Sequence, residues 1–340
     1  MPTWGELLRE LNDLEQKAAS PGGGQPNDGQ SPCDRLRRKY LKLLSEHTKR
    51  ATICYSTSWM ENKPVPNGSE TLTVALRDIH GFMEAASNIE VRELDLIITS
   101  PGGDADAAEA IMGYLRSRFD HIRAVVPVAA MSAATMMALS CDEILMGTHS
   151  QLGPIDPQFT VTAPEGQRSS PAQAIIDQFE LAKAECQDPA NLGAWLPILR
   201  TLAPGLVAQC THAIERAKQF VTDQLTAHML SGDDDAAARV AEWFADFPRF
   251  KSHGRPVRID DVESQNLRVI RLEDDDKLQD LVLSVHHATR LTFGRTAATK
   301  LIENHRGRAF IESMHVQPTG PIEIAIPTAP GIPQPQSNGS

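Results

Sequence analysis

The sequence predicts an α/β fold built on a mostly parallel sheet. Between residues 51 and 147, short apolar segments typical of strands alternate with segments whose apolar residues recur at helical spacing. This alternation indicates strand–helix–strand crossovers, and strands that are apolar throughout indicate a sheet buried on both faces. The 340 residues are 41% hydrophobic and 23% charged, which are ordinary values for a globular protein.

The expected elements follow one another in a regular order. An amphipathic helix occupies the first twenty residues, a glycine- and proline-rich flexible linker follows, and a second helix spans 34–50. The expected strands are 51–59, 94–100, 122–128 and 143–147, and the helices between them are 70–86, 106–119 and 132–139. Residues 171–230 are mainly helical, and 267–274 form a late strand. We expect residues 1–32 to lie outside one large domain, 33–316, and the tail 317–340 to be disordered.

Charge and cysteine content exclude several classes of protein. The formal net charge of −11 argues against nucleic-acid or anionic lipid partners, because both need a basic surface. The five cysteines are scattered without a CxxC pair, which fits neither a disulfide framework nor a zinc site. The N-terminus interleaves apolar and acidic residues, unlike a secretory signal. We therefore expect no metal or cofactor, and a reducing compartment such as the cytoplasm.

An uncharged run from Ala124 to Cys141 is about long enough to cross a membrane. Pro127 interrupts it, most of its residues are small, and no aromatic belt or basic cluster flanks it. We therefore expect a buried strand followed by a buried helix and no transmembrane segment. Peripheral membrane association through a partner stays open.

The motif SPGG places two glycines directly after the strand 94–100 and before a helix. Glycines there allow a sharp turn that brings backbone N–H groups close to a ligand, and the helix adds its positive N-terminal end. Such a turn can hold a developing oxyanion, although most strand-to-helix glycine turns are only turns. It is no dinucleotide fingerprint, because GxGxxG is absent and Asp104 and Asp106 would repel a phosphate.

Ser132 lies at a second strand-to-helix junction, in the motif AAMSAAT. A serine in the first turn of a helix is usually an N-cap or a packing residue. Here alanines on both sides leave space around the hydroxyl, and the following N–H groups point out of the helix end. Ser132 is therefore either a cap or a nucleophile.

Together, SPGG, AMSAAT, DEILMG and LGPIDPQ resemble, in this order and spacing, the Clp-protease/crotonase superfamily. More narrowly they resemble its serine dehydrogenase proteinase branch, related to signal peptide peptidase A, specifically over residues 53–158 and loosely to 287. The resemblance implies a Clp/crotonase-like fold with a helical C-terminal half and Ser132 as nucleophile. It implies an oxyanion hole on the turn that begins at Gly102, from the N–H groups of Gly103 or Asp104 together with that of Ala133. It also implies a cofactor-independent serine peptidase with peptide or protein substrates, acting as a homo-oligomer.

A serine hydroxyl needs a neighbouring base, and the sequence leaves that base open. The signal peptide peptidase relatives use lysine, and Lys183 falls in the apolar stripe of its helix, four residues after Phe179. Burial there would favour the neutral amine. Its position 51 residues after Ser132 (183 minus 132) resembles the lysine arrangement of those peptidases. Lys183 is the predicted base, with Lys218, Lys251 and His253 as alternatives.

Four further expectations concern the site and its function. Asp156 is expected to be a turn and capping residue, and His149 a surface histidine. Ala134 stands where proteins of this kind commonly carry glycine, and a catalytically silent scaffold is therefore one alternative function. A crotonase-like acyl-CoA enzyme is another, although the region around SPGG supplies acids and no bases for the nucleotide phosphates.

Overall fold

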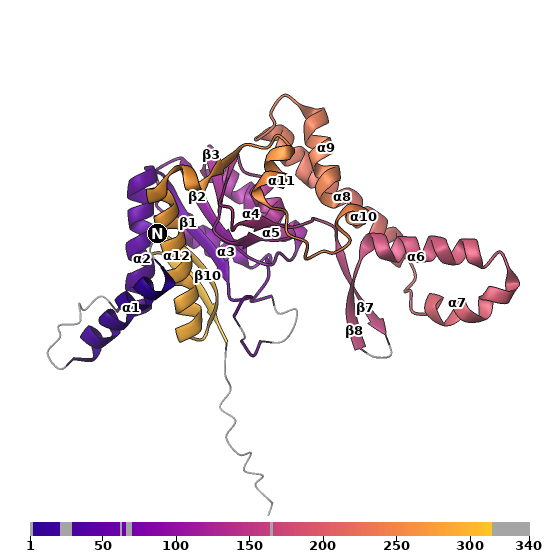
Figure 1. The fold of residues 1–340 in the computed structure, drawn as a ribbon, viewed down its shortest axis with the longest axis horizontal. Coiled ribbons are helices and arrows are strands. Elements are labelled where there is room, and N and C mark those ends of the chain that lie inside the picture. The colour runs from indigo at the N-terminus through magenta and orange to yellow at the C-terminus, as the bar shows by residue number, and fades with distance from the viewer. Residues whose placement is uncertain (1–2, 21–28, 62, 66–69, 164–165, 315–340) are drawn as a thin grey trace, which may run out of the picture.

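The computed structural model describes residues 3–20, 29–61, 63–65, 70–163 and 166–314. Most of the expected linker and the whole tail from residue 317 lie outside the described residues. Figure 1 shows a body built around one large sheet, from which a hairpin and several helices project to one side.

The central sheet has seven strands in the order β11-β10-β1-β2-β3-β5-β9. Five of these strands run parallel to one another: β1 (Ala51–Thr57), β2 (Glu93–Thr99), β3 (His121–Val126), β5 (Glu143–Met146) and β9 (Val269–Arg271). The strands β10 (Ala298–Asn304) and β11 (Ala309–Ser313) add an antiparallel edge. The expected mostly parallel α/β sheet is confirmed, and its antiparallel edge was not predicted.

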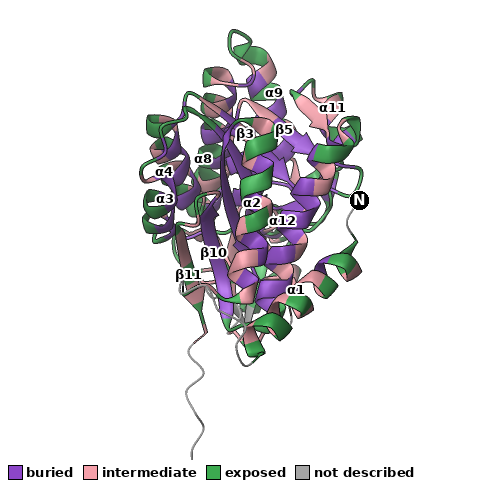
Figure 2. Ribbon diagram, turned by 90° about the vertical axis from the view of Figure 1, so that its left-hand side faces the viewer, coloured by how far each residue is buried: buried purple, intermediate pink, exposed green. Residues whose placement is uncertain are grey.

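Helices cover both faces of this sheet because alternate strand residues point to opposite sides. Ile53 and Tyr55 of β1 join a core cluster with α3 (Asp78–Ala86), α4 (Ala105–Arg118) and α5 (Ala133–Leu139). Cys54 points the other way, into a cluster with α2 (Pro32–Thr48) and α12 (Asp276–Arg295). The helix α1 (Trp4–Ala19) packs on α2 and α12 (Figure 2). None of the described helices is both long and apolar enough to span a membrane.

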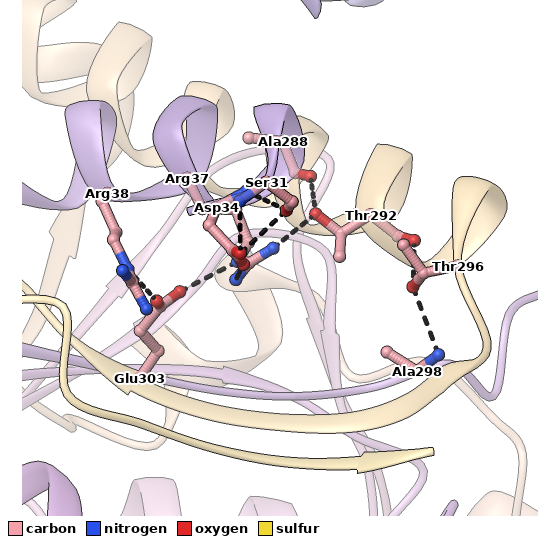
Figure 3. Close-up of polar contacts among 9 residues, drawn as sticks. All are labelled: Ser31, Asp34, Arg37, Arg38, Ala288, Thr292, Thr296, Ala298 and Glu303. Atoms are coloured by element: carbon pink, nitrogen blue, oxygen red, sulfur yellow. Dashed lines mark hydrogen bonds and ion pairs between the residues drawn. The ribbon is translucent and has the colours of Figure 1, made fainter. Parts of the chain in front are cut away.

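A buried ionic network joins α2 to the sheet and to α12 (Figure 3). The side chain of Arg37 is fully buried and donates to Glu303 of β10 at 2.9 Å, to Thr292 of α12 at 2.8 Å and to Asp34 at 2.6 Å. Arg38 donates to the second oxygen of Glu303 at 2.8 Å. Each buried charge thus has a geometrically matched partner, which is the condition for tolerating charge in a core.

The helix expected over 70–86 begins only at Asp78. The Asp78 carboxylate accepts hydrogen bonds from the Ala75 N–H group at 3.1 Å and from the Tyr55 hydroxyl at 2.8 Å. The residues before it form an irregular segment, and Val74 makes a parallel bridge to Gly103. Contacts to the sheet therefore override the helical propensity of residues 70–77. The same residues lie against the glycine turn.

The remaining elements belong to the C-terminal half and to two small sheets. The two-residue strands β4 (Ala129–Ala130) and β6 (Gln151–Leu152) pair with each other. An unpredicted hairpin of β7 (Gln158–Ala163) and β8 (Gly166–Pro171) leads into α6 (Ala172–Glu185), η1 (Pro189–Asn191) and α7 (Leu192–Leu199). We call the described residues of 158–210 the arm, which projects from the body in Figure 1.

The chain returns to the body along α8 (Leu206–Ala227), whose Phe220 and Val221 enter the main core. It continues through α9 (Asp234–Ala245), α10 (Phe247–Phe250) and α11 (Ile259–Ser264), and η2 (Leu272–Asp274) follows β9. The late strand expected over 267–274 is thus shorter, because its last residues turn into η2. The helix α12 was not predicted.

Candidate active site

The SPGG motif forms a turn between β2 and α4 that lies directly against Ser132. Gly102 has a φ of +94° and Gly103 a φ of +152°, conformations that side chains disfavour. A Cβ atom on Gly102 would lie 2.6 Å from the Ser132 Cβ and 2.5 Å from the Met131 carbonyl oxygen. Glycine is therefore required for the turn to approach the serine this closely.

Backbone hydrogen bonds hold this turn to the segment before α3. The Val74 N–H group donates to the Gly102 carbonyl at 2.8 Å, and the Asp104 N–H group donates to the Val74 carbonyl at 2.9 Å. Between them, the N–H group of Gly103 has no acceptor in the described part of the chain. The Asp104 carboxylate caps α4 by accepting from the N–H group of Asp106 at 2.9 Å. Of the two sequence candidates, Gly103 is thus the residue with a free donor.

Ser132 stands at the start of α5 in a strained conformation. Its φ of +51° and ψ of −121° lie outside the regions that non-glycine residues normally occupy. Its side chain makes no capping hydrogen bond, so the simple capping role is wrong. Backbone strain of this kind costs about 1–3 kcal/mol and concentrates at functional sites.

A second free donor lies beside the serine. The N–H group of Ala133 has no acceptor among the described residues, whereas that of Ala134 donates to the Met131 carbonyl at 2.9 Å. Ala134 is fully buried in the main core and does not border the cavity described next. Its methyl group therefore packs inside the body, away from the space in front of Ser132.

Ser132 borders a cavity of about 440 Å³ that is open on one side. The glycine turn and the start of α5 form one wall, α8 forms another, and the loops before β7 and after α10 complete it. The lining residues are Thr73, Pro101, Gly102, Gly103, Asp104, Ala105, Asp106, Ser132, Ala133, Met136, Ile155, Pro157, Gln158, Phe159, Ala213, Arg216, Ala217 and His253. Both free N–H donors thus belong to residues of this cavity.

His253 borders the same cavity and is paired with Asp156. Its Nδ1 atom lies 2.8 Å from the Asp156 carboxylate, and the Asp156 side chain is only 3% exposed. The second carboxylate oxygen of Asp156 accepts from the Gln158 amide at 2.7 Å. Asp156 is thus a buried partner of a histidine, which the sequence did not show. No local pattern connects the two residues, and the one available sign was that Asp156 belongs to the LGPIDPQ motif.

The lysines named from the sequence lie elsewhere. The Lys183 side chain is 58% exposed and pairs with Glu180 at 2.7 Å, so its expected desolvation is wrong. The reason is that α6 belongs to the arm, where no layer of the body covers that face. Lys218 pairs with Glu242 at 2.6 Å, and Lys251 is exposed at the end of α10. None of these three described lysines borders the cavity.

One lysine that the sequence did not single out is bonded to the segment that holds the glycine turn. Lys300 of β10 is fully buried and donates to the carbonyls of Glu70 and Thr73 at 2.8 Å each, and to Asp78 at 2.6 Å. Burial lowers the pKa of Lys300, and the Asp78 carboxylate opposes that shift. Lys300 thereby holds the segment to which the glycine turn is bonded.

The described residues include no group of three or more His, Cys, Asp or Glu side chains placed to hold a metal ion. All five cysteines lie in the described part of the chain and are free thiols. Burial raises the pKa of the Cys54 and Cys141 thiols to about 12. Both therefore stay protonated at neutral pH.

Ser132 is strained, its hydroxyl is free, and it borders a cavity beside two free N–H donors, which are the groups that serine-hydrolase chemistry uses. The family model of the ClpP-like SDH-type serine proteinases matches residues 83–246, from α3 to the end of α9. This match, over 164 of the 340 residues, confirms the resemblance carried by SPGG and AMSAAT.

Two curated relatives are uncharacterized proteins of Methanocaldococcus jannaschii. One is 38% identical over 101 residues, which are 30% of this chain and 32% of the relative. The other is 42% identical over 161 residues, which are 46% of this chain and 47% of the relative. The chain therefore spans less than half the length of each of these two relatives.

Three solved structures show weaker likeness. Two are variants of the 1510-N membrane-bound stomatin-specific protease. One is 14% identical with a TM-score of 0.37, over 62% of this chain and 79% of that one. The other, in complex with a substrate peptide, is 16% identical with a TM-score of 0.36, over 61% of this chain and 74% of that one. The third is an enoyl-CoA hydratase from Mycobacterium avium subsp. paratuberculosis, at 17% identity and a TM-score of 0.25 over 63% of this chain and 90% of that one. At these scores the likenesses add nothing to the assignment of the site.

Proposed function

We propose that this protein is a cofactor-independent serine peptidase that hydrolyses peptide bonds through an acyl-enzyme on Ser132. The observation that carries the proposal is Ser132 itself. A residue that only caps or packs would gain nothing from a φ of +51° and a hydroxyl without a capping bond. A nucleophile gains from both, because the strain presents the free hydroxyl at the edge of the turn.

The chemistry follows from the groups around the serine. The Ser132 Oγ attacks the carbonyl carbon of the scissile bond, and the carbonyl oxygen becomes an oxyanion. The free N–H groups of Gly103 and Ala133 would donate to that oxygen without any need for reorganisation. A general base takes the serine proton and passes it to the leaving amine, and water then hydrolyses the acyl-enzyme.

The family resemblance implies a Ser–Lys dyad, with Lys183 as one candidate for the general base. In the single chain Lys183 is exposed and pairs with Glu180, so a dyad needs the arm to move or a second copy to supply the lysine. A homo-oligomer, also implied by the resemblance, would provide such a copy. Peptide or protein substrates are proposed on the same grounds.

The test is labelling of the full-length protein with a fluorophosphonate probe. We expect the wild type to label and Ser132→Ala to remain unlabelled. Ser117→Ala, which changes an exposed serine on α4, is the matched control and should label like the wild type. Failure of the wild type to label, checked with the assembled protein, would contradict the proposed function and favour a silent scaffold.

A further inference from the structure

His253 and Asp156 are brought to the cavity by two loops that the body holds in fixed positions. Leu152 and Val257 exchange two backbone hydrogen bonds of 2.9 Å each, which pairs the loop before β7 with the loop after α10. The Ile155 N–H group donates to the Phe244 carbonyl at the end of α9 at 3.0 Å. These backbone contacts hold the chain just before Asp156 and on either side of His253.

The nucleophile helix is tied to the same loop. The Thr135 hydroxyl on α5 donates to the Ala130 carbonyl at 2.7 Å and accepts from the Gly153 N–H group at 2.9 Å. Thr135 is fully buried, so this link is shielded from water. Ser132, three residues before Thr135, and Asp156, three residues after Gly153, are therefore parts of one hydrogen-bonded frame.

The contact between His253 and Asp156 determines which ring nitrogen can act. A carboxylate only accepts hydrogen bonds, so the neutral imidazole must carry its proton on Nδ1, the atom that lies 2.8 Å from Asp156. The other nitrogen, Nε2, then carries the lone pair. In the described structure Nε2 has no hydrogen-bond partner, so its lone pair is free on a side chain that borders the cavity. This is the tautomer that a general base requires.

Resting on the proposed acylation of Ser132, we propose that His253 is the general base of this enzyme and that Asp156 is its positioning residue. In the first step the Oγ–carbon bond forms while the serine proton moves to His253 Nε2. The resulting imidazolium, paired with Asp156, gives that proton to the amine as the carbon–nitrogen bond breaks. A water molecule enters in place of the amine, loses its proton to the same nitrogen, and releases the carboxylic acid.

The charges around the cavity suit this assignment. Four charged residues line the cavity or contact the histidine: Asp104 and Asp106 on the glycine-turn side, Arg216 on α8, and Asp156 at Nδ1 of the ring. Arg216 forms ion pairs with Asp106, at 3.5 Å, and with Glu109. Asp156 is therefore the buried carboxylate that would pair with a protonated His253.

The experiment measures the rate of fluorophosphonate labelling of the full chain between pH 5 and 9. We expect His253→Ala and His253→Gln each to label at least about 100-fold more slowly than the wild type, because general-base catalysis contributes factors of about 10²–10⁴. Added imidazole should restore part of the rate in His253→Ala and none in Ser132→Ala. His212→Ala, which changes an exposed histidine on α8 outside the cavity, is the control.

Asp156→Asn tests the positioning role. We expect slower labelling of folded Asp156→Asn and a rate closer to that of the wild type in Asp156→Glu, because an amide can also donate to Nδ1 and so allows the other tautomer. A merely structural role for Asp156 would lower the amount of folded protein without slowing the labelling of the folded fraction. Normal thermal unfolding of His253→Gln and Asp156→Asn establishes that the rates are those of folded protein.

The outcomes separate this inference from the proposed function. If the wild type labels on Ser132 and both His253 variants label at the wild-type rate, the inference is wrong while the serine peptidase stands. If Lys183→Ala, and not the His253 variants, slows labelling, the lysine dyad is the correct mechanism. If the wild type fails to label at all, the proposed function itself has failed.

Discussion

The body and the arm differ in whether they bury a lysine, as Lys300 and Lys183 show. Lys300 on β10 is fully buried, donates three hydrogen bonds and pairs with Asp78. Lys183 on α6 follows an apolar stripe, yet its side chain is 58% exposed and its partner Glu180 is on the same helix. An apolar stripe indicates burial only where a second layer of structure covers it.

The arm has only a small core of its own. Ala172, Ile175 and Cys210 form its buried cluster. Its exposed large apolar residues are Leu181, Leu192, Leu196 and Ile198. In the body, by contrast, strand residues such as Leu96 and Ile98 are fully buried. The stability of the chain must therefore come mainly from the body.

The largest difference between the two regions should appear when the two lysines are replaced. Lys300→Met leaves the buried Asp78 carboxylate without its cation and is expected to lower the free energy of unfolding by about 3–5 kcal/mol. Lys183→Met removes an exposed pair and should change it by less than about 1 kcal/mol. Urea denaturation of both variants measures the two values.

The double variant Lys300→Met with Asp78→Asn sharpens this test. It removes the uncompensated charge, so it should be more stable than Lys300→Met alone. If Lys300→Met were as stable as the wild type, the contacts of Lys300 with Glu70, Thr73 and Asp78 would not be what holds the segment 70–78 in place.

A smaller effect is expected from a titrating group on the body helix α12. Burial, with a contribution from His287, Arg290 and His149, lowers the pKa of His286 to about 3. Below pH 6.5 the unfolded chain takes up a proton that the folded protein refuses, so stability falls as the pH falls. Between pH 6.5 and 4.5, His286 should lower the free energy of unfolding by about 2 kcal/mol.

The variant His286→Leu checks that value. Its free energy of unfolding should fall less steeply than that of the wild type between pH 6.5 and 4.5. The same two proteins compared at pH 7.5 form the control, because the imidazole is then neutral in both states. Parallel slopes for the two proteins would show that His286 is protonated in the folded state.

The smallest effect is expected in the arm. Leu196 of α7 is 48% exposed, so Leu196→Ala should change the free energy of unfolding by less than about 0.5 kcal/mol. Leu96→Ala on β2, where the side chain is fully buried, should cost about 2–5 kcal/mol. A loss above 1 kcal/mol for Leu196→Ala, growing with protein concentration, would instead show that a second copy covers this face.

Much of the fold and part of the site follow from the sequence by itself. The alternation of apolar strands and helices predicted the parallel sheet, because each crossover is a local pattern of about 30 residues. The glycines of SPGG and the alanines around Ser132 also act locally, since close approach of two backbones requires small residues at that place. Ser132 could therefore be singled out before the structure.

Only the tertiary structure decided which distant groups meet. His253 lies 97 positions from Asp156, and Lys300 lies 222 positions from Asp78. Whether an apolar stripe is covered was also decided by packing. This is why Lys183 was wrongly expected to be buried, while no burial was expected of Lys300. The physical reason is common to all of these cases: burial and pairing depend on what lies across space, and periodicity along the chain does not contain that information.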